Sequence, residues 1–340
     1  AQCIVGSGAR LPDAALRRLQ EAWQPRLTDL EHDPEPEARA AVGRALGRLT
    51  LGGLPLDDRP GVGVRLDAGR KPLVPDIDWV EVPAGEFRYG EKDRRIRLPA
   101  FHIARYPITT CQFRCFIDDP QGYADPRWWD GLAERSERAA AAAWDYANHP
   151  RETVSWFEAM AFCRWLSQTL GYEVRLPQEQ EWEKAARGAD GREFPWGEFS
   201  PGHANIIERW AHDGPHYLGL TSAVGIYPQG ASPFGALDMA GNVWEWCLNR
   251  YDKPSETDPG GDDGRVVRGG SWYDNREGAR CAYRGYSLPG DRDGRQPLQS
   301  RLSGVVCLPH PLKRWPREHW SLFFWFAGSL PRRRAALTGA

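Results

Sequence analysis

The first fifty residues show helical periodicity and no strand-like alternation. Residues 11–23 and 34–49 each have the pattern of a helix, and the second begins with the proline and acidic residues typical of a helix start. The second helix carries small apolar side chains at a spacing near 3.6 residues, namely Ala38, Ala41, Val42, Ala45 and Leu49. We expect this stripe to pack closely against another part of the chain.

The pattern changes near residue 78, where apolar and polar positions begin to alternate. Residues 79–90 and 95–109 are typical of strands. Residues 153–171 have a helical period that ends at a glycine, and residues 172–188 form a strand followed by a further helix. Beyond these, glycine, proline, asparagine, aspartate and tryptophan dominate. Two helices on a small mixed sheet, with extensive loops, predict the α+β class.

Composition narrows the possible partners and compartments. The 44 Lys and Arg residues nearly balance the 46 Asp and Glu residues, so no overall basic field favours nucleic acid. The seven cysteines include no CxxC pair, which argues against a disulfide framework and a zinc cluster. The N-terminus lacks a signal-peptide pattern, and the longest apolar run, residues 321–330, is too short to span a bilayer. We therefore expect a cytoplasmic protein without a membrane partner.

Several motifs together carry a family resemblance. They are DWVEVPAGEF, HIARYPITTCQFRCFI, ETVSWFEAMAFCRWLS, EVRLPQEQEWEKAARG, FPWG, ANII, SPFGALDMAGNVWEWC and RVVRGGSW. The chain resembles the formylglycine-generating-enzyme (sulfatase-modifying factor) family, which implies a variant of the C-type lectin fold over residues 73–310. Residues 1–72 resemble a single HEAT-type helical repeat with a linker, and one repeat cannot bury its own face. Residues 311–340 form a C-terminal tail without a family counterpart.

The resemblance also implies where catalytic cysteines would lie. In the family's enzymes two copper-binding cysteines follow the RGGS segment, whereas this chain has Asp274 and Ala279 in that stretch. Cu(I) needs soft thiolate ligands, and Cys281 alone cannot supply a pair. Iron-dependent sulfoxide-synthase relatives carry a histidine-rich helical domain, whereas residues 1–72 contain only His32. These departures predict that the chain is not an enzyme.

A second branch of the resemblance fits the segment after RGGSW. Variable proteins of diversity-generating retroelements use this fold as a scaffold and vary the residues between fixed framework positions. Many binding loops are also enriched in Tyr, Ser, Gly and Asn. We therefore predict a variable, ligand-binding face on residues 273–295. Its predicted contact residues are Tyr273, Asp274, Asn275, Glu277, Gly278, Tyr283, Gly285, Tyr286, Ser287, Gly290, Asp293, Gly294 and Arg295.

Other motifs have both structural and functional interpretations. In the enzyme relatives an asparagine of the GNVWEW motif helps to bind calcium, and oxygen ligands at a turn suit that ion. The calcium candidates by this resemblance are Asn242, Glu245, Asn205 and Ile206. The alternative is a hydrogen-bonded turn. Arg268 and Arg280 are predicted to be buried structural arginines that bridge loop carbonyls or Asp238.

The interpretation favoured by the sequence is a non-catalytic ligand-binding protein whose unknown ligand is a protein or a cell-surface molecule. One alternative is a formylglycine-generating-type oxidase or related sulfatase-modifying enzyme. Another is a sensory or effector domain attached to helical repeats. Eight arginines stand against four acidic residues between Arg265 and Arg301, but they recur at framework positions. We therefore expect no nucleic-acid partner.

Overall fold

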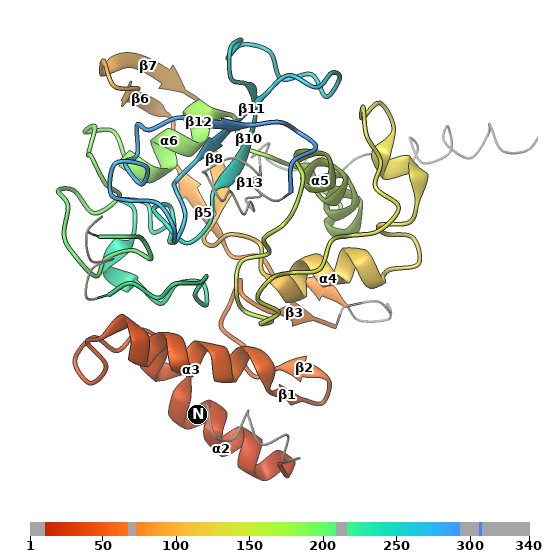
Figure 1. The fold of residues 1–340 in the computed structure, drawn as a ribbon, viewed down its shortest axis with the longest axis vertical. Helices are drawn as coiled ribbons and strands as arrows, with labels where there is room; N and C mark the ends of the chain where they lie inside the picture. Colours follow the sequence, from red (N-terminus) through yellow and green to blue (C-terminus); the bar gives the residue numbers. More distant parts are fainter. Residues whose placement is uncertain (1–10, 67–72, 209–215, 293–305, 308–340) are drawn as a thin grey trace, which may run out of the picture.

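The computed structural model describes residues 11–66, 73–208, 216–292 and 306–307. Small sheets and short helices are joined by long loops (Figure 1). This arrangement confirms the α+β class. The predicted tail, residues 311–340, lies outside the described residues. No described helix is both long and apolar enough to cross a lipid bilayer.

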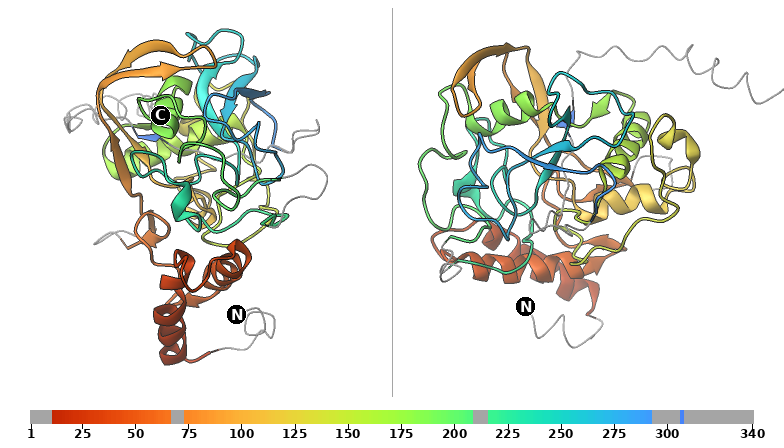
Figure 2. Two further views of the ribbon diagram at one scale, coloured as in Figure 1. Left: turned by 90° about the vertical axis from the view of Figure 1, so that its left-hand side faces the viewer. Right: turned by 45° about the horizontal axis from the view of Figure 1, so that its top comes forward.

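Two N-terminal helices lie together at one end of the molecule, as the views in Figures 1 and 2 agree. They are α2 (Asp13–Trp23) and α3 (Pro36–Arg48), with a 3₁₀ turn, η1 (Pro25–Leu27), between them. Their buried side chains form one apolar cluster with Ala223, Ile226 and Tyr227 of the main domain. The N-terminal helices are therefore packed onto the domain.

Helix α3 is buried on more than the predicted stripe. Val42 and Ala45 are buried as expected, but Ala38, Ala41 and Leu49 are only partly buried. Gly43 and Gly47 provide the close approach, because a Cβ atom there would lie 2.7 Å from Ala223 Cβ and 2.1 Å from Asn148 Oδ1. The helix packs against α2 and η1 as well as against the domain, which explains why its buried surface exceeds a single stripe.

Three further α-helices belong to the main domain. They are α4 (Thr110–Asp118), α5 (Trp156–Leu170) and α6 (Glu179–Arg187), and two 3₁₀ turns accompany them, η2 (Pro126–Trp129) and η3 (Pro228–Gly230). Helix α5 begins with a capping box between Ser155 and Glu158, which satisfies backbone donors at its first turn. It ends at Gly171, whose φ of 78° is readily adopted by glycine.

The strands form small sheets rather than one large sheet. A three-stranded antiparallel sheet has the order β10–β11–β12, and the other strands pair antiparallel as β1–β2, β3–β4, β5–β8, β6–β7 and β9–β13. Within the described residues, parallel pairing is confined to two isolated bridges, Asn205–Gly241 and Ile207–Asn275. The strand bounds are β1 (Thr50–Leu51), β2 (Leu54–Pro55), β3 (Val64–Arg65), β4 (Val74–Pro75), β5 (Trp79–Val82), β6 (Gly85–Tyr89), β7 (Arg94–Leu98), β8 (Phe101–Ala104), β9 (Val174–Arg175), β10 (Glu245–Arg250), β11 (Arg265–Arg268), β12 (Gly285–Ser287) and β13 (Val306–Cys307).

Candidate binding face

The segment after β11 begins with a buried arginine. The Arg268 side chain has no solvent exposure, and its Nη2 donates 2.6 Å hydrogen bonds to Glu183 Oε2 and to the carbonyl oxygen of Cys281. Its guanidinium also lies over the Trp182 ring. The prediction of a structural arginine is confirmed for Arg268, although its acidic partner is Glu183 of α6 and not Asp238. This contact ties the loop to the helix beneath it.

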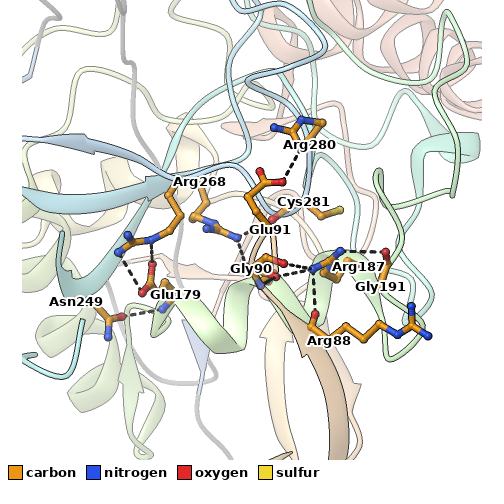
Figure 3. Close-up of polar contacts among 12 residues, drawn as sticks. Arg88, Gly90, Glu91, Glu179, Arg187, Gly191, Asn249, Arg268, Arg280 and Cys281 are labelled. Atoms are coloured by element: carbon orange, nitrogen blue, oxygen red, sulfur yellow. Dashed lines mark hydrogen bonds and ion pairs between the residues drawn. The ribbon is translucent and has the colours of Figure 1, made fainter. Parts of the chain in front are cut away.

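A second set of ion pairs fixes the far end of the same segment. Arg284 Nε donates to Glu179 Oε2 at 2.6 Å, and Arg292 Nε donates to Glu158 Oε2 at 2.8 Å. Both carboxylates are buried at helix starts. Arg280 pairs with Glu91 at 3.0 Å, which fits the predicted structural role. Its side chain is only half-buried, however, and not fully buried as predicted. Figure 3 shows Arg268, Arg280, Arg187 and Glu179 within this network of polar contacts. We call Arg268, Arg284, Glu179 and Glu183 the frame.

Outside the frame, several predicted contact residues project into solvent. Tyr273 is 40% exposed and Tyr286 is 58% exposed, and Glu277 is also exposed. Leu288, which the sequence analysis did not select, is 53% exposed. A lone exposed leucine is common at protein surfaces, and only its position two residues after Tyr286 could have indicated it. We call Tyr273, Glu277, Tyr286 and Leu288 the face.

The other predicted contact residues are less accessible. Gly278, Gly285 and Ser287 are buried, whereas Asp274, Asn275, Tyr283 and Gly290 are partly buried. Gly285 has a packing reason, since a Cβ atom there would lie 2.9 Å from Val267 Cγ2. Asp293, Gly294 and Arg295 lie outside the described residues. The structure therefore brings the exposed residues of 273–288 onto a loop that buried residues support.

Asp274 stands where the family resemblance implies a cysteine in the enzymes. Its Oδ2 accepts hydrogen bonds from the backbone N and the Oγ of Ser271, at 2.9 and 2.5 Å. Burial raises the pKa of the Asp274 carboxyl. This aspartate closes a local turn at the start of the loop.

The five cysteines with described surroundings are buried, and in four of them burial disfavours the thiolate. Burial raises the pKa of Cys111 to about 11 and that of Cys115 to about 12, and it also raises the pKa of Cys247 and Cys281. A reactive or metal-binding cysteine needs the thiolate form. Within the described ranges, no group of three or more His, Cys, Asp or Glu side chains is arranged to hold a metal ion.

The calcium candidates lie around a strained turn. Asn242 has a φ of 64°, and its Oδ1 accepts hydrogen bonds from Ser222 N at 2.9 Å and Asn205 Nδ2 at 3.3 Å. Ile206 is a buried apolar residue of the neighbouring segment. The two donors to the Asn242 oxygen fit a hydrogen-bonded turn, so this oxygen is not free for an ion in the arrangement described. Calcium binding stays a prediction.

Glu245 is the acidic residue of the same motif and is also buried. It accepts a 2.6 Å hydrogen bond from Trp182 Nε1 through Oε2. Burial raises its pKa to about 8, so the neutral carboxyl is favoured at neutral pH. A neutral carboxyl is a weak ligand for a hard cation, and the geometry favours a structural role for Glu245.

The fold and these residues identify a sulfatase-modifying-factor-type domain. A family model described as the sulfatase-modifying factor enzyme 1-like domain matches residues 67–296, and the chain belongs to this family. A solved structure titled Treponema denticola variable protein 1 has a TM-score of 0.50 and 21% identity, covering 68% of this chain and 95% of its own. At this identity the likeness shows the shared fold.

Two named enzymes correct one prediction from the sequence. Hercynine oxygenase of Mycolicibacterium thermoresistibile is 33% identical over 303 residues, which are 76% of this chain and 64% of the oxygenase. Formylglycine-generating enzyme of Thermomonospora curvata is 29% identical over 57% of this chain and 82% of that enzyme. The expectation that the chain is not an enzyme was therefore wrong, because these relatives point to enzymatic function. The absence of the cysteine pair argues only against the copper-dependent oxidation of the formylglycine-generating enzymes.

Proposed function

We propose that this chain is the substrate-binding domain of an enzyme of the sulfatase-modifying factor family and that its substrate rests on the face. The observation that carries the proposal is the distribution of exposed large apolar and aromatic side chains. Among the described residues there are six, and Tyr273, Tyr286 and Leu288 are three of them. Half of the set thus lies within one short segment, as expected for a contact surface.

The redox chemistry would need groups beyond those described. The chain spans 64% of the oxygenase it matches, and its described residues include no metal-ligand cluster and no accessible cysteine pair. We therefore assign the described residues the role of holding and orienting the substrate. Metal ligands would come from residues outside the described part or from another polypeptide.

Binding measurements test this function directly. The full chain is titrated by calorimetry with hercynine and, separately, with a cysteine-containing peptide, the substrate class of the formylglycine-generating relatives. We expect one of the two to bind, with at least a tenfold loss of affinity for Tyr273→Ala. Ile117→Ala is the control, because Ile117 is 39% exposed but lies on α4, outside the segment that carries the face. If neither ligand binds, or if both variants bind like the parent, the proposal fails.

A second candidate is the variable protein of a diversity-generating retroelement, with a protein or cell-surface molecule as its ligand. The supporting observation is the alternation along the segment, where exposed Tyr273, Glu277 and Tyr286 are interspersed with the buried or paired arginines 268, 280 and 284. Genome sequence tests it. We expect a nearby near-copy of this coding stretch, differing only at adenines of that copy, beside a reverse transcriptase gene. Without either neighbour, this candidate is abandoned.

A further inference from the structure

A surface cleft is lined in part by Tyr286 and Leu288 of the face, and the proposed function assigns no role to its other residues. Its volume is about 410 Å³, and it lies between strand β12 and the loop that follows β10. Tyr251, Tyr286 and Leu288 form its less polar walls, and Asp252, Asp262 and Asp263 line the rest. Among these residues, the sequence analysis selected only Tyr286.

The two tyrosines form an aromatic wall that is held in place. Their ring centroids are 4.9 Å apart, with an interplanar angle of 39°. The Arg284 guanidinium lies 4.6 Å from the Tyr251 ring centroid, so the frame fixes this ring. Tyr286 also packs on Gly264, where an added Cβ atom would lie 3.0 Å from Tyr286 Cδ2. Tyr286 is nevertheless 58% exposed and therefore accessible to a ligand.

The carboxylates of the cleft are not all neutralised by nearby cations. Asp263 forms an ion pair with Arg250, which also pairs with Asp258 at 2.9 Å and Glu256 at 3.5 Å. By contrast, Asp252 and Asp262 are exposed and form no ion pair with any described residue. The cleft therefore combines an exposed aromatic ring with uncompensated negative charge.

We propose that this cleft receives the positively charged end of a lysine or arginine side chain from a peptide ligand. The inference rests on the proposed function and names the substrate class of the face. A cation is attracted to the face of a tyrosine ring and to nearby carboxylates. Tyr286 and Leu288 belong both to the cleft and to the face, so a peptide held on the face would place a side chain in the cleft.

Fluorescence anisotropy with labelled peptides tests the proposal. The probe is a nonapeptide of alternating glycine and lysine, and the controls replace every lysine by glutamine or by glutamate. We expect the lysine peptide to bind at low salt and the two controls to bind at least tenfold more weakly. Weakening of the lysine peptide at 0.5 M salt is expected as well, because exposed charges are screened.

Matched variants separate the cleft from general electrostatics. The double variant Asp252→Asn, Asp262→Asn is expected to weaken lysine-peptide binding about tenfold or more. Glu256 belongs to the same loop but does not line the cleft. The Glu256→Gln variant should therefore weaken lysine-peptide binding less than threefold. Tyr286→Ala should weaken binding strongly, whereas Tyr286→Phe, which keeps the ring, should retain most of it.

Several outcomes overturn the proposal. One is equal binding of the lysine and glutamine peptides, and another is an equal loss for Glu256→Gln and the double variant. Binding of tetramethylammonium in a calorimetric titration, without any lysine-peptide binding, would show a small-cation site and would also overturn it. If the lysine peptide fails but hercynine or the cysteine peptide still binds in a Tyr273-dependent way, the cleft proposal falls and the proposed function stands.

Discussion

The arginines of the frame and the side chains of the face come from the same stretch of chain but differ in burial and in their partners. Arg268 is fully buried against Glu183, and Arg284 pairs with the buried Glu179. Tyr273 and Tyr286, a few residues away, are 40% and 58% exposed. The difference shows how one loop can keep its shape while presenting changeable side chains, because its conformation is fixed by contacts that the exposed residues do not make.

The largest expected effect comes from breaking the frame at Arg268. Arg268→Ala leaves the buried Glu183 carboxylate without this partner, and removing one member of a buried pair costs about 3–5 kcal/mol. We expect a loss of that size in the free energy of unfolding, measured by urea denaturation. Arg276→Ala is the control, because Arg276 is exposed and its contacts among the described residues are an ion pair with exposed Glu277 and a cation–π contact with partly buried Phe199. Similar losses in both variants would contradict the distinction.

A pH-dependent effect is expected at Glu245, beneath the frame. Burial raises its pKa in the folded protein to about 8 from 4.5, so the folded state holds a proton that the unfolded state loses first. Its stabilising contribution is complete below about pH 4.5 and is lost as pH rises to about 8.

The Glu245→Gln variant should abolish this dependence. Between pH 5 and pH 8 the parent should lose about a few kcal/mol of its free energy of unfolding through Glu245, and the variant should not show this loss. Urea denaturation at the two pH values measures the change. Burial also raises the pKa of Asp238, to about 6. Asp238→Asn serves as the comparison, because the pH-dependent loss of stability that it removes should end near pH 6 instead of pH 8. Parallel pH profiles for Glu245→Gln and the parent would refute the assignment.

A smaller effect is expected where a predicted contact residue proves to be buried. Gly285→Ala places a methyl group 2.9 Å from Val267 Cγ2 and 3.2 Å from Trp244. Overpacking of this kind typically costs about 1–3 kcal/mol. Thermal unfolding measures it, with Gly290→Ala as a partly buried glycine control whose nearest contact is the flexible end of Glu134. A melting temperature equal to that of the parent would show that β12 adjusts freely.

The smallest effect on stability is expected at the face itself. Glu277→Ala removes an exposed side chain whose ion pairs, with Arg280 and Arg276, are also near the surface. Surface substitutions of this kind usually stay within about 0.5 kcal/mol. Circular dichroism melts check this expectation, and a clear loss of stability would place Glu277 in the frame instead.

Local patterns predicted part of this organisation. The α+β class, the helix ending at Gly171 and the structural role of Arg268 followed from periodicity, glycine placement and the family resemblance. The partners did not, because Arg268 and Glu183 are 85 residues apart in the chain and Arg284 and Glu179 are 105 apart. Long-range pairing of this kind depends on tertiary packing, which no local pattern encodes.

The contact residues of the face were predicted from residue type, and only some of them are exposed in the structure. Residue type alone could not distinguish exposed Tyr286 from buried Gly285, since exposure in β12 depends on which neighbours pack against each side. The cleft was missed because Tyr251 and Asp262 come from a different loop. The conclusion about catalysis was wrong because two missing features, the copper-binding cysteine pair and the histidine-rich helical domain, were taken to exclude all enzymatic chemistry in the family.

A single denaturation experiment tests the separation of frame and face most directly. The variant replaces Tyr273, Glu277, Tyr286 and Leu288 together by serine, and its urea unfolding is compared with that of the parent and of Arg268→Ala. We predict that the fourfold variant loses no more than about 2 kcal/mol in its free energy of unfolding, well below the loss for Arg268→Ala. A fourfold variant as unstable as Arg268→Ala would contradict the account, since the face would then be holding the loop together.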